Sequence, residues 1–173
     1  ASDWSSDVCS SDLKGRPLLK PLSLMVPDEN AMGLYCEDVP PQAHALAKRF
    51  WPGPLTMVLL KRDEVPMETT GGLDTVAVRM PRNDATLKLI ELSGTAVSGP
   101  SANISGRPSP TSWEHVRADL GGRIDAIICG EPSDGGIEST VLDLTDPNHP
   151  AILRPGLVTP EMISAVCGRD VSY

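Results

Sequence analysis

Apolar residues along the chain fall in short runs, most of which have the length or the two-residue period of a β-strand. Leu55–Leu60 (LTMVLL) is a continuous apolar run and predicts a buried strand, whereas Asp74–Met80 (DTVAVRM) alternates between polar and apolar positions. The other predicted strands are equally short: Leu22–Val26, Thr95–Ser98, Asp125–Cys129, Ser139–Leu144 and Ala151–Leu153.

Helical periodicity appears in segments between these strands. Gln42–Phe50 carries apolar residues at helical spacing before a Pro-Gly-Pro stop. Asn83 is a suitable N-cap for a helix over Asp84–Leu92, which Gly94 closes. Two further helices are predicted, one capped by Ser112 and running to about Leu120, the other beginning at Thr159 with Pro160 in the first helical position.

The order of these elements predicts the fold class. Strands and helices are mixed without strict β-α-β alternation, which indicates one α/β domain with a twisted, mixed sheet and flanking helices. The chain of 173 residues suits a single domain with a sizeable core. Its 17 prolines and 15 glycines punctuate the apolar runs, which favours many short elements joined by tight turns.

The charge balance restricts the possible partners. The net charge is −8, and residues 1–13 contribute three aspartates and no Lys or Arg. Such an acidic protein is a poor general nucleic-acid binder, although converging basic residues can still bind an anionic small molecule. No apolar run approaches the roughly 20 residues of a membrane span, and no secretory signal is recognisable. We therefore expect a cytoplasmic protein without a membrane partner.

The cysteines and histidines do not predict a metal site. Cys9, Cys36, Cys129 and Cys167 form no CxxC pair, so any metal ligands remain unknown. Cys129 and Cys167 lie in apolar runs and are predicted to be buried structural thiols. The three histidines lack catalytic or metal-binding spacing and are interpreted as surface residues.

The segment richest in candidate chemistry is Ser98–Thr111, SGPSANISGRPSPT. It follows a predicted strand, precedes a helix, and combines hydroxyls, one amide and small residues that let backbone N–H groups approach a ligand. These properties suit phosphate or nucleotide binding, although the segment is not a P-loop. An ordinary polar loop is the alternative.

Cations occur at the ends of the predicted strands. Lys14, Arg16 and Lys20 precede the first strand, where they could grip phosphates or form a solvated turn. Arg79 ends an apolar strand and is costly to bury unpaired, so we expect it to face a polar cleft or a carboxylate, as in a structural salt bridge. Arg154 follows the same pattern in AILRPG.

Hydroxyls also open a strand in GIESTVLDL. Ser139 and Thr140 follow the turn at Pro132–Gly136. Glu138 beside them is a candidate general base to which nothing else in the sequence gives a role.

Six motifs occur in a consistent order along the chain: KGRP at 14–17 with KPLSLMV at 20–26, FWPGPLTMVL at 50–59, TVAVRMP at 75–81, SGPSANISGRPSPT at 98–111, GIESTVLDL at 136–144 and ILRPG at 152–156. Together they resemble the YrdC-like family of threonylcarbamoyl-AMP synthases and cover nearly everything from Lys14 to about Gly156. The SxN loop with its GxPSPT extension, and the ESTV and LRPG pair, are specific to that pattern.

The resemblance implies a reaction and a twisted α/β sheet around a deep basic cleft. Threonine and bicarbonate form a carbamate, which attacks the α-phosphate of ATP to give threonylcarbamoyl-AMP and pyrophosphate, with Mg²⁺ assisting. A partner threonylcarbamoyl transferase complex then moves the threonylcarbamoyl group to an adenosine beside the tRNA anticodon. Among the properties it implies is binding of double-stranded RNA.

The resemblance also assigns site residues. Those for ATP are Lys14, Arg16, Lys20, Thr75, Ser101, Asn103, Ser109 and Arg154. Those for threonine are Arg79, Gly99, Ser139 and Met25. Lys20 and Met25 depart from the family, which often has Asn and His there, and a Met cannot make the hydrogen bond that a His would offer to threonine.

The first residues differ from the rest of the chain. The family's PT-E-T-YGL motif should lie upstream of Lys14, where residues 3–13 instead match one reading frame of a common sequencing adapter. We expect residues 1–13 to be a non-native or disordered leader. Residues 14–173 would then be a YrdC-like domain that lacks its N-terminal elements and the C-terminal domain of longer members.

Two other functions compete with the synthase. One is a YrdC-like domain that holds nucleotide or RNA without turnover. The other is a carbamoyl-transfer domain like that of hydrogenase maturation proteins, which would have acylphosphatase and zinc-finger modules beside it. Neither module is recognisable in this sequence.

Overall fold

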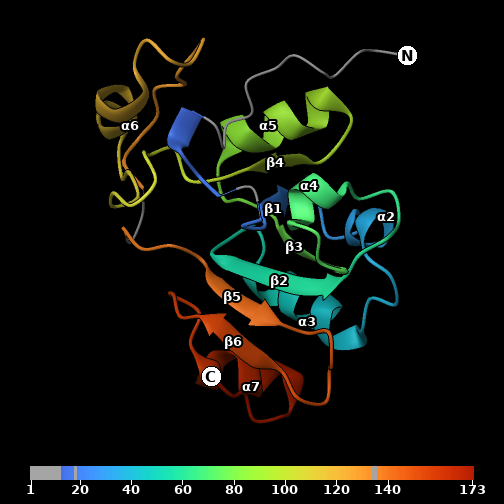
Figure 1. Ribbon diagram of the computed structural model, residues 1–173. Helices are drawn as coiled ribbons and strands as arrows, with labels where there is room; N and C mark the ends of the chain where they lie inside the picture. The colour runs from blue at the N-terminus through green and yellow to red at the C-terminus, as the bar shows by residue number, and fades with distance from the viewer. Residues whose placement is uncertain (1–12, 18, 134–135) are drawn as a thin grey trace.

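A six-stranded β-sheet forms the frame of the molecule (Figure 1). The computed structural model describes residues 13–17, 19–133 and 136–173, so most of the leader predicted at residues 1–13 lies outside the described residues. The strands are β1 (Ser23–Met25), β2 (Leu55–Leu60), β3 (Thr75–Arg79), β4 (Val97–Gly99), β5 (Thr140–Asp143) and β6 (Ala151–Arg154). The fold is the predicted single α/β domain.

The strand order in space is β4-β1-β3-β2-β5-β6. Two neighbouring pairs are parallel, β1 with β3 and β2 with β5, and the other three are antiparallel. Following these directions across the sheet, β3 and β6 point the same way. Their last residues, Arg79 and Arg154, therefore lie toward the same edge of the sheet although two strands separate them.

The described helices are short and surround the sheet: α2 (Met32–Tyr35), α3 (Pro41–Phe50), α4 (Met67–Thr70), α5 (Asp84–Ser93), α6 (Trp113–Leu120) and α7 (Pro160–Cys167). α3 and α7 contact each other, and their buried Leu46 and Ile163 belong to the main hydrophobic core. α6 and its flanking loops stand to one side of the molecule (Figure 1).

The side chains of a strand point alternately to the two faces of the sheet, of which one packs on the core and the other is open. In β3 the side chains of Val76 and Val78 are buried in the core, whereas Thr75, Ala77 and Arg79 are only half-buried. Because successive residues of a strand point to opposite faces, these three side chains project from the other face. That face carries the candidate site.

Local signals predicted the helix ends well. The Asn83 side chain accepts a hydrogen bond from the Thr86 backbone N–H at 2.9 Å, and Gly94 ends α5 in the left-handed conformation. Thr159 accepts from the Met162 N–H at 3.4 Å at the start of α7. Ser112 is the N-cap residue of α6, but its side chain accepts no hydrogen bond from that helix.

Three predictions were wrong. Asp125–Cys129 forms no strand, because none of its backbone groups pairs with a described strand and the segment is largely exposed. Cys129 is consequently an exposed thiol, and Cys167 is only half-buried, in contrast to Cys36, which is buried. The helices α2 and α4 were not predicted, since four-residue helices have almost no periodic pattern.

The exposure of the three histidines agrees with their interpretation as surface residues. Among the described residues, no helix is long and apolar enough to cross a membrane.

Candidate functional site

A cavity of about 820 Å³ lies on the open face of the sheet. Met25, Thr75, Ala77 and Arg79 line it from β1 and β3, and the loop after β4 supplies a second wall. All twelve residues that the sequence assigned to a site line this cavity: Lys14, Arg16, Lys20, Met25, Thr75, Arg79, Gly99, Ser101, Asn103, Ser109, Ser139 and Arg154.

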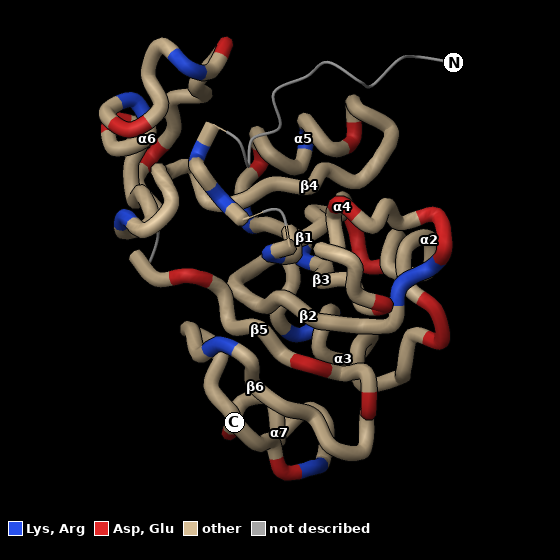
Figure 2. The backbone as a smooth tube through the Cα atoms, viewed as in Figure 1, with Lys and Arg blue, Asp and Glu red and all other residues tan. Residues whose placement is uncertain are grey.

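The cavity wall is strongly basic although the chain is acidic. Its charged side chains comprise six cations and, among the described residues, one carboxylate, Glu138. The acidic residues gather elsewhere, notably around α2 and α4 (Figure 2). A wall with this excess of positive charge favours an anionic ligand despite the net charge of −8.

Lys14 is the most enclosed of these cations, with only 6% of its surface exposed. Its Nζ donates to the Ser101 carbonyl oxygen and lies 3.4 Å from the Ser101 hydroxyl, while its own carbonyl accepts from the Ser105 N–H. Burial, followed by the neighbouring charges of Arg16 and Lys20, lowers the pKa of Lys14. Lys14 therefore ties the N-terminal segment to the loop after β4.

Arg16 lies next to it and is held by backbone oxygens. Its guanidinium donates to the carbonyls of Pro21 at 2.8 Å and Lys20 at 3.4 Å, whereas its Nε is buried without a partner. Burial lowers the pKa of Arg16. An unpaired buried donor on a cavity wall is a group that a ligand oxygen would satisfy.

The buried side chain of Asn103 holds the loop after β4 through hydrogen bonds to its backbone. Its Nδ2 donates to the carbonyls of Ile104 at 3.0 Å and Arg107 at 2.8 Å, and its Oδ1 is buried without a partner. Asp119 of α6 holds the outside of the loop through Arg107 at 2.6 Å and the Ile104 N–H at 3.2 Å. The hydrogen bond from Arg107 lowers the pKa of Asp119.

Arg79 faces the cavity, and no carboxylate of the described residues pairs with it. The structural salt bridge considered from the sequence is therefore not formed within this part of the chain. Burial and then the charge of Arg154 lower its pKa. The guanidinium is positioned to bind a ligand anion.

Arg154 is by contrast fully engaged with the segment before β5. Its Nε and Nη2 donate to the Ser139 carbonyl at 3.1 and 2.8 Å, Nη2 also donates to the Ser139 hydroxyl at 3.0 Å, and Nη1 pairs with Glu138. The Ser139 hydroxyl is itself 2.8 Å from the Thr56 hydroxyl of β2. Glu138 continues this network by accepting from Ser109 at 2.7 Å.

Gly99 and Met25 lie near each other in the wall. A Cβ at Gly99 would lie 3.6 Å from the Met25 methyl carbon, so the Met25 side chain lies close to Gly99 on the adjacent strand β4. Lys20, Thr75 and Ser101 also line the cavity, and of these Lys20 and Ser101 are exposed whereas Thr75 is half-buried.

Comparison with known proteins agrees with this geometry. The profile of the Sua5/YciO/YrdC family, which carries the description telomere recombination, matches residues 11–156. The chain belongs to the Sua5/YciO/YrdC family. Threonylcarbamoyl-AMP synthase of Pyrococcus abyssi is 51% identical over 157 residues, which are 91% of this chain and 46% of that protein.

Other members of the Sua5/YciO/YrdC family are similarly close. Threonylcarbamoyl-AMP synthase of Bacillus subtilis is 47% identical over 91% of this chain and 45% of its own length. The crystal structure of Pyrococcus abyssi Sua5 complexed with L-threonine has a TM-score of 0.88 and 48% identity, and covers 94% of this chain and 48% of that one. The chain thus spans about half the length of these relatives.

Two charged residues among the described lining of this Sua5/YciO/YrdC domain had no binding role assigned from the sequence. Arg107 lines the cavity although only its neighbours in the serine-rich loop were singled out. Glu138 was noted as a candidate base, but its contacts with Ser109 and Arg154 depend on the folded chain. The position of Arg107 within SGPSANISGRPSPT was the available signal for the first, and no sequence signal indicated the contacts of the second.

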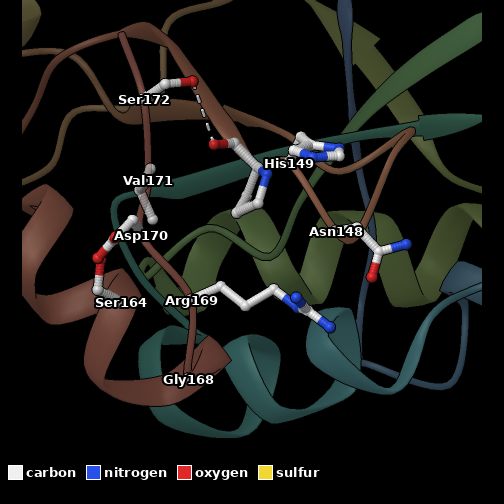
Figure 3. Close-up of a pocket in the computed structure, with 9 residues that line it drawn as sticks. Asn148, His149, Ser164, Gly168, Arg169, Asp170, Val171 and Ser172 are labelled. Atoms are coloured by element: carbon white, nitrogen blue, oxygen red, sulfur yellow. Dashed lines mark hydrogen bonds between the residues drawn. The ribbon is translucent and has the colours of Figure 1, made fainter.

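A second hollow, of about 640 Å³, lies near the C-terminal end (Figure 3). His149, Arg169 and Asp170 line it, and the Ser172 hydroxyl donates to the Pro150 carbonyl across it at 3.5 Å. None of the residues assigned from the sequence lines this hollow. The candidate site is therefore the basic cavity on the sheet.

Proposed function

We propose that this domain is an L-threonylcarbamoyladenylate synthase, which makes threonylcarbamoyl-AMP and pyrophosphate from L-threonine, bicarbonate and ATP. The observation that carries the proposal is the guanidinium of Arg79, which has no carboxylate partner among the described residues, in the same cavity as the cation group formed by Lys14, Arg16 and Lys20. A small carboxylate and a polyphosphate would find separate cationic partners there. The names of the relatives, and the threonine complex of the Pyrococcus abyssi protein, support this choice of substrates.

The threonine site in this proposal is built around Arg79. The guanidinium would bind the threonine carboxylate, and the Gly99 backbone would lie against the amino acid with Ser139 and Met25 beside it. The Ser139 hydroxyl is already hydrogen-bonded to Thr56 and Arg154, so it would be held in a fixed orientation. Met25 supplies apolar contact only.

The nucleotide would occupy the remainder of the cavity. The assigned Lys and Arg side chains would bind phosphate oxygens. The Ser and Thr hydroxyls and the Asn103 amide would bind phosphate, ribose or base. The assigned residues are Lys14, Arg16, Lys20, Thr75, Ser101, Asn103, Ser109 and Arg154. The buried, unpaired Arg16 Nε and Asn103 Oδ1 are the polar atoms that most need a ligand or water.

Positioning and charge neutralisation would account for catalysis. A carbamate oxygen forms a bond to the α-phosphorus of ATP, the bond from that phosphorus to the oxygen of the β-phosphate breaks, and pyrophosphate leaves. Such a displacement needs in-line placement and stabilised phosphate charge rather than covalent help from the protein.

Mg²⁺ would enter the site with ATP. The described residues contain no group of three or more His, Cys, Asp or Glu side chains suited to a metal ion. Mg²⁺ commonly keeps waters and is held by substrate phosphates with one or two carboxylates, and Glu138 is the carboxylate in this wall. The donor set thus fits an ion carried by the nucleotide, whose charge would help to neutralise the phosphates.

Downstream partners follow from the same proposal. Threonylcarbamoyl-AMP is a reactive mixed anhydride, so a transferase complex that delivers the group to tRNA would consume it. We propose a cytoplasmic location on this basis. Contact with tRNA or double-stranded RNA would involve the basic margin of the cavity rather than the acidic remainder of the surface.

The test is pyrophosphate release from the purified chain given ATP, Mg²⁺, bicarbonate and threonine, with each component omitted in turn. Release that requires threonine and bicarbonate supports the synthase. ATP binding without threonine-dependent pyrophosphate release would instead indicate a nucleotide-binding domain without turnover. Pyrophosphate release that does not depend on threonine would refute threonine as the substrate.

A further inference from the structure

Glu138 occupies an unusual position within the basic cavity. Its two carboxylate oxygens contact two segments that are distant in the sequence, with Oε1 accepting from the Ser109 hydroxyl at 2.7 Å and Oε2 pairing with Arg154 Nη1. Ser109 belongs to the loop after β4, and Arg154 ends β6. One anion therefore joins two groups that the proposed function assigns to the nucleotide.

The electrostatic influence of Glu138 extends beyond these contacts. It is the only acidic side chain among the described residues of the cavity wall, and its charge acts to raise the pKa of both Lys14 and Arg16. A negative charge at this point weakens the attraction of the whole cation group for another anion. A site that bound only phosphate would have no carboxylate at this position.

The backbone beneath Glu138 is fixed, whereas its carboxylate is accessible. Its carbonyl oxygen would lie 2.7 Å from a Cβ at Gly156, and the following residue, Ser139, is buried and bonded to Thr56. The side chain itself is 44% exposed and that of Arg154 is 41% exposed. Ion pairs with this exposure are weak, so a stronger anion can displace the carboxylate without disturbing the backbone.

We propose that Glu138 is an intramolecular competitor for phosphate, holding Ser109 and Arg154 until the phosphate chain of the bound nucleotide takes its place. The identity of that ligand rests on the proposed function. The free site would then keep these two segments joined and its cations partly neutralised. After the reaction, the return of the carboxylate to Arg154 would help pyrophosphate to leave.

The test uses binding of inorganic pyrophosphate, measured by calorimetry without threonine or turnover. Glu138→Gln keeps the shape and hydrogen-bonding capacity of the side chain and removes its charge. We expect it to bind pyrophosphate about three- to tenfold more tightly than the unmodified chain, since it loses a weak exposed ion pair and a repulsive charge. Glu37→Gln is the matched control, because Glu37 is exposed and does not line the cavity.

A second variant distinguishes the effect of the Glu138 contacts on pyrophosphate binding from the effect of its charge. Glu138→Asp keeps the charge but shortens the side chain, so that its carboxylate no longer spans Ser109 and Arg154. We expect intermediate tightening, and an affinity equal to that of the unmodified chain would refute competition by contact.

Unchanged or weaker binding by Glu138→Gln, or no pyrophosphate binding by either protein, would overturn the proposal. These results concern anion binding alone. A failure of the synthase proposal, seen as missing threonine-dependent turnover, would therefore be recognised separately.

Discussion

Arg79 and Arg154 end two strands that point the same way and line one cavity, yet only Arg154 has a carboxylate partner among the described residues. Burial and then the charge of Arg154 lower the pKa of Arg79, so the two guanidinium charges repel each other. Glu138 compensates one of them. Arg79 has no such partner among the described residues, and this difference leads to the first prediction.

Arg79→Ala should raise the threonine KM by about tenfold to a hundredfold, the loss expected for a charge-assisted hydrogen bond, with a much smaller effect on the ATP KM. Initial rates of pyrophosphate release, with each substrate varied in turn, measure both constants. Arg49→Ala is the matched control, because Arg49 is exposed on α3 and lies outside the cavity. Equal changes in the two constants would contradict the assigned role of Arg79.

Asn103 should prove to be a structural support as well as a ligand group. Asn103→Ala leaves the carbonyls of Ile104 and Arg107 without their donor, and should lower the free energy of unfolding by about 1–2 kcal/mol. Asn103→Asp should cost more, because it turns an acceptor toward those carbonyls. Urea unfolding measures both variants, and an aspartate variant as stable as the parent would show that the loop does not depend on this amide.

Gly156 should tolerate no side chain. A Cβ there would lie 2.5 Å from the Thr140 nitrogen and 2.7 Å from the Glu138 carbonyl oxygen, so Gly156→Ala should destabilise the fold by about 2–4 kcal/mol and disturb the cavity wall. Gly130→Ala is the control, since nothing lies within 4 Å of its Cβ position. Thermal unfolding compares the two, and similar melting temperatures would exclude the close approach at Gly156.

The buried thiol of Cys36 should make stability fall at alkaline pH. Burial raises its pKa to about 12 from an ordinary value of 9.0. In the alkaline range between these values the unfolded chain has released this proton and the folded chain has retained it, so the free energy of unfolding decreases as pH rises. The slope from one such group is about 1.4 kcal/mol per pH unit.

Urea unfolding of the unmodified chain and of Cys36→Ala, between about pH 8 and about pH 10.5, isolates this contribution from other titrating groups. The unmodified chain should lose stability more steeply. Parallel slopes would show that the Cys36 thiol is not protected from ionisation.

Sequence reasoning succeeded where the relevant forces act over a few residues. Asn83 and Gly94 mark the ends of α5 because a cap bonds to backbone three residues away and glycine adopts the left-handed conformation. Leu55–Leu60 coincides with β2. Asp125–Cys129 has a similar apolar composition but no strand beside it, and composition alone does not provide one.

The motifs also singled out residues that share one cavity, without specifying their arrangement in it. The twelve assigned residues share one cavity wall, as the resemblance implied, but their partners were not predictable. Glu138 illustrates this limit, since its neighbours Ser109 and Arg154 come from distant segments. Likewise, nothing local distinguishes the unpaired Arg79 from the paired Arg154.

The sequence by itself determined six of the strands, the longer helices, the caps at Asn83 and Thr159, the α/β class and the chemical groups available for binding an anion. The tertiary structure decided the strand order, which side chains of each strand face the cavity, and which cation is neutralised. The physical reason is the separation along the chain of the residues that interact. Caps and periodicity depend on neighbours within one or two turns, whereas burial and charge compensation depend on whatever the sheet brings close from the rest of the chain.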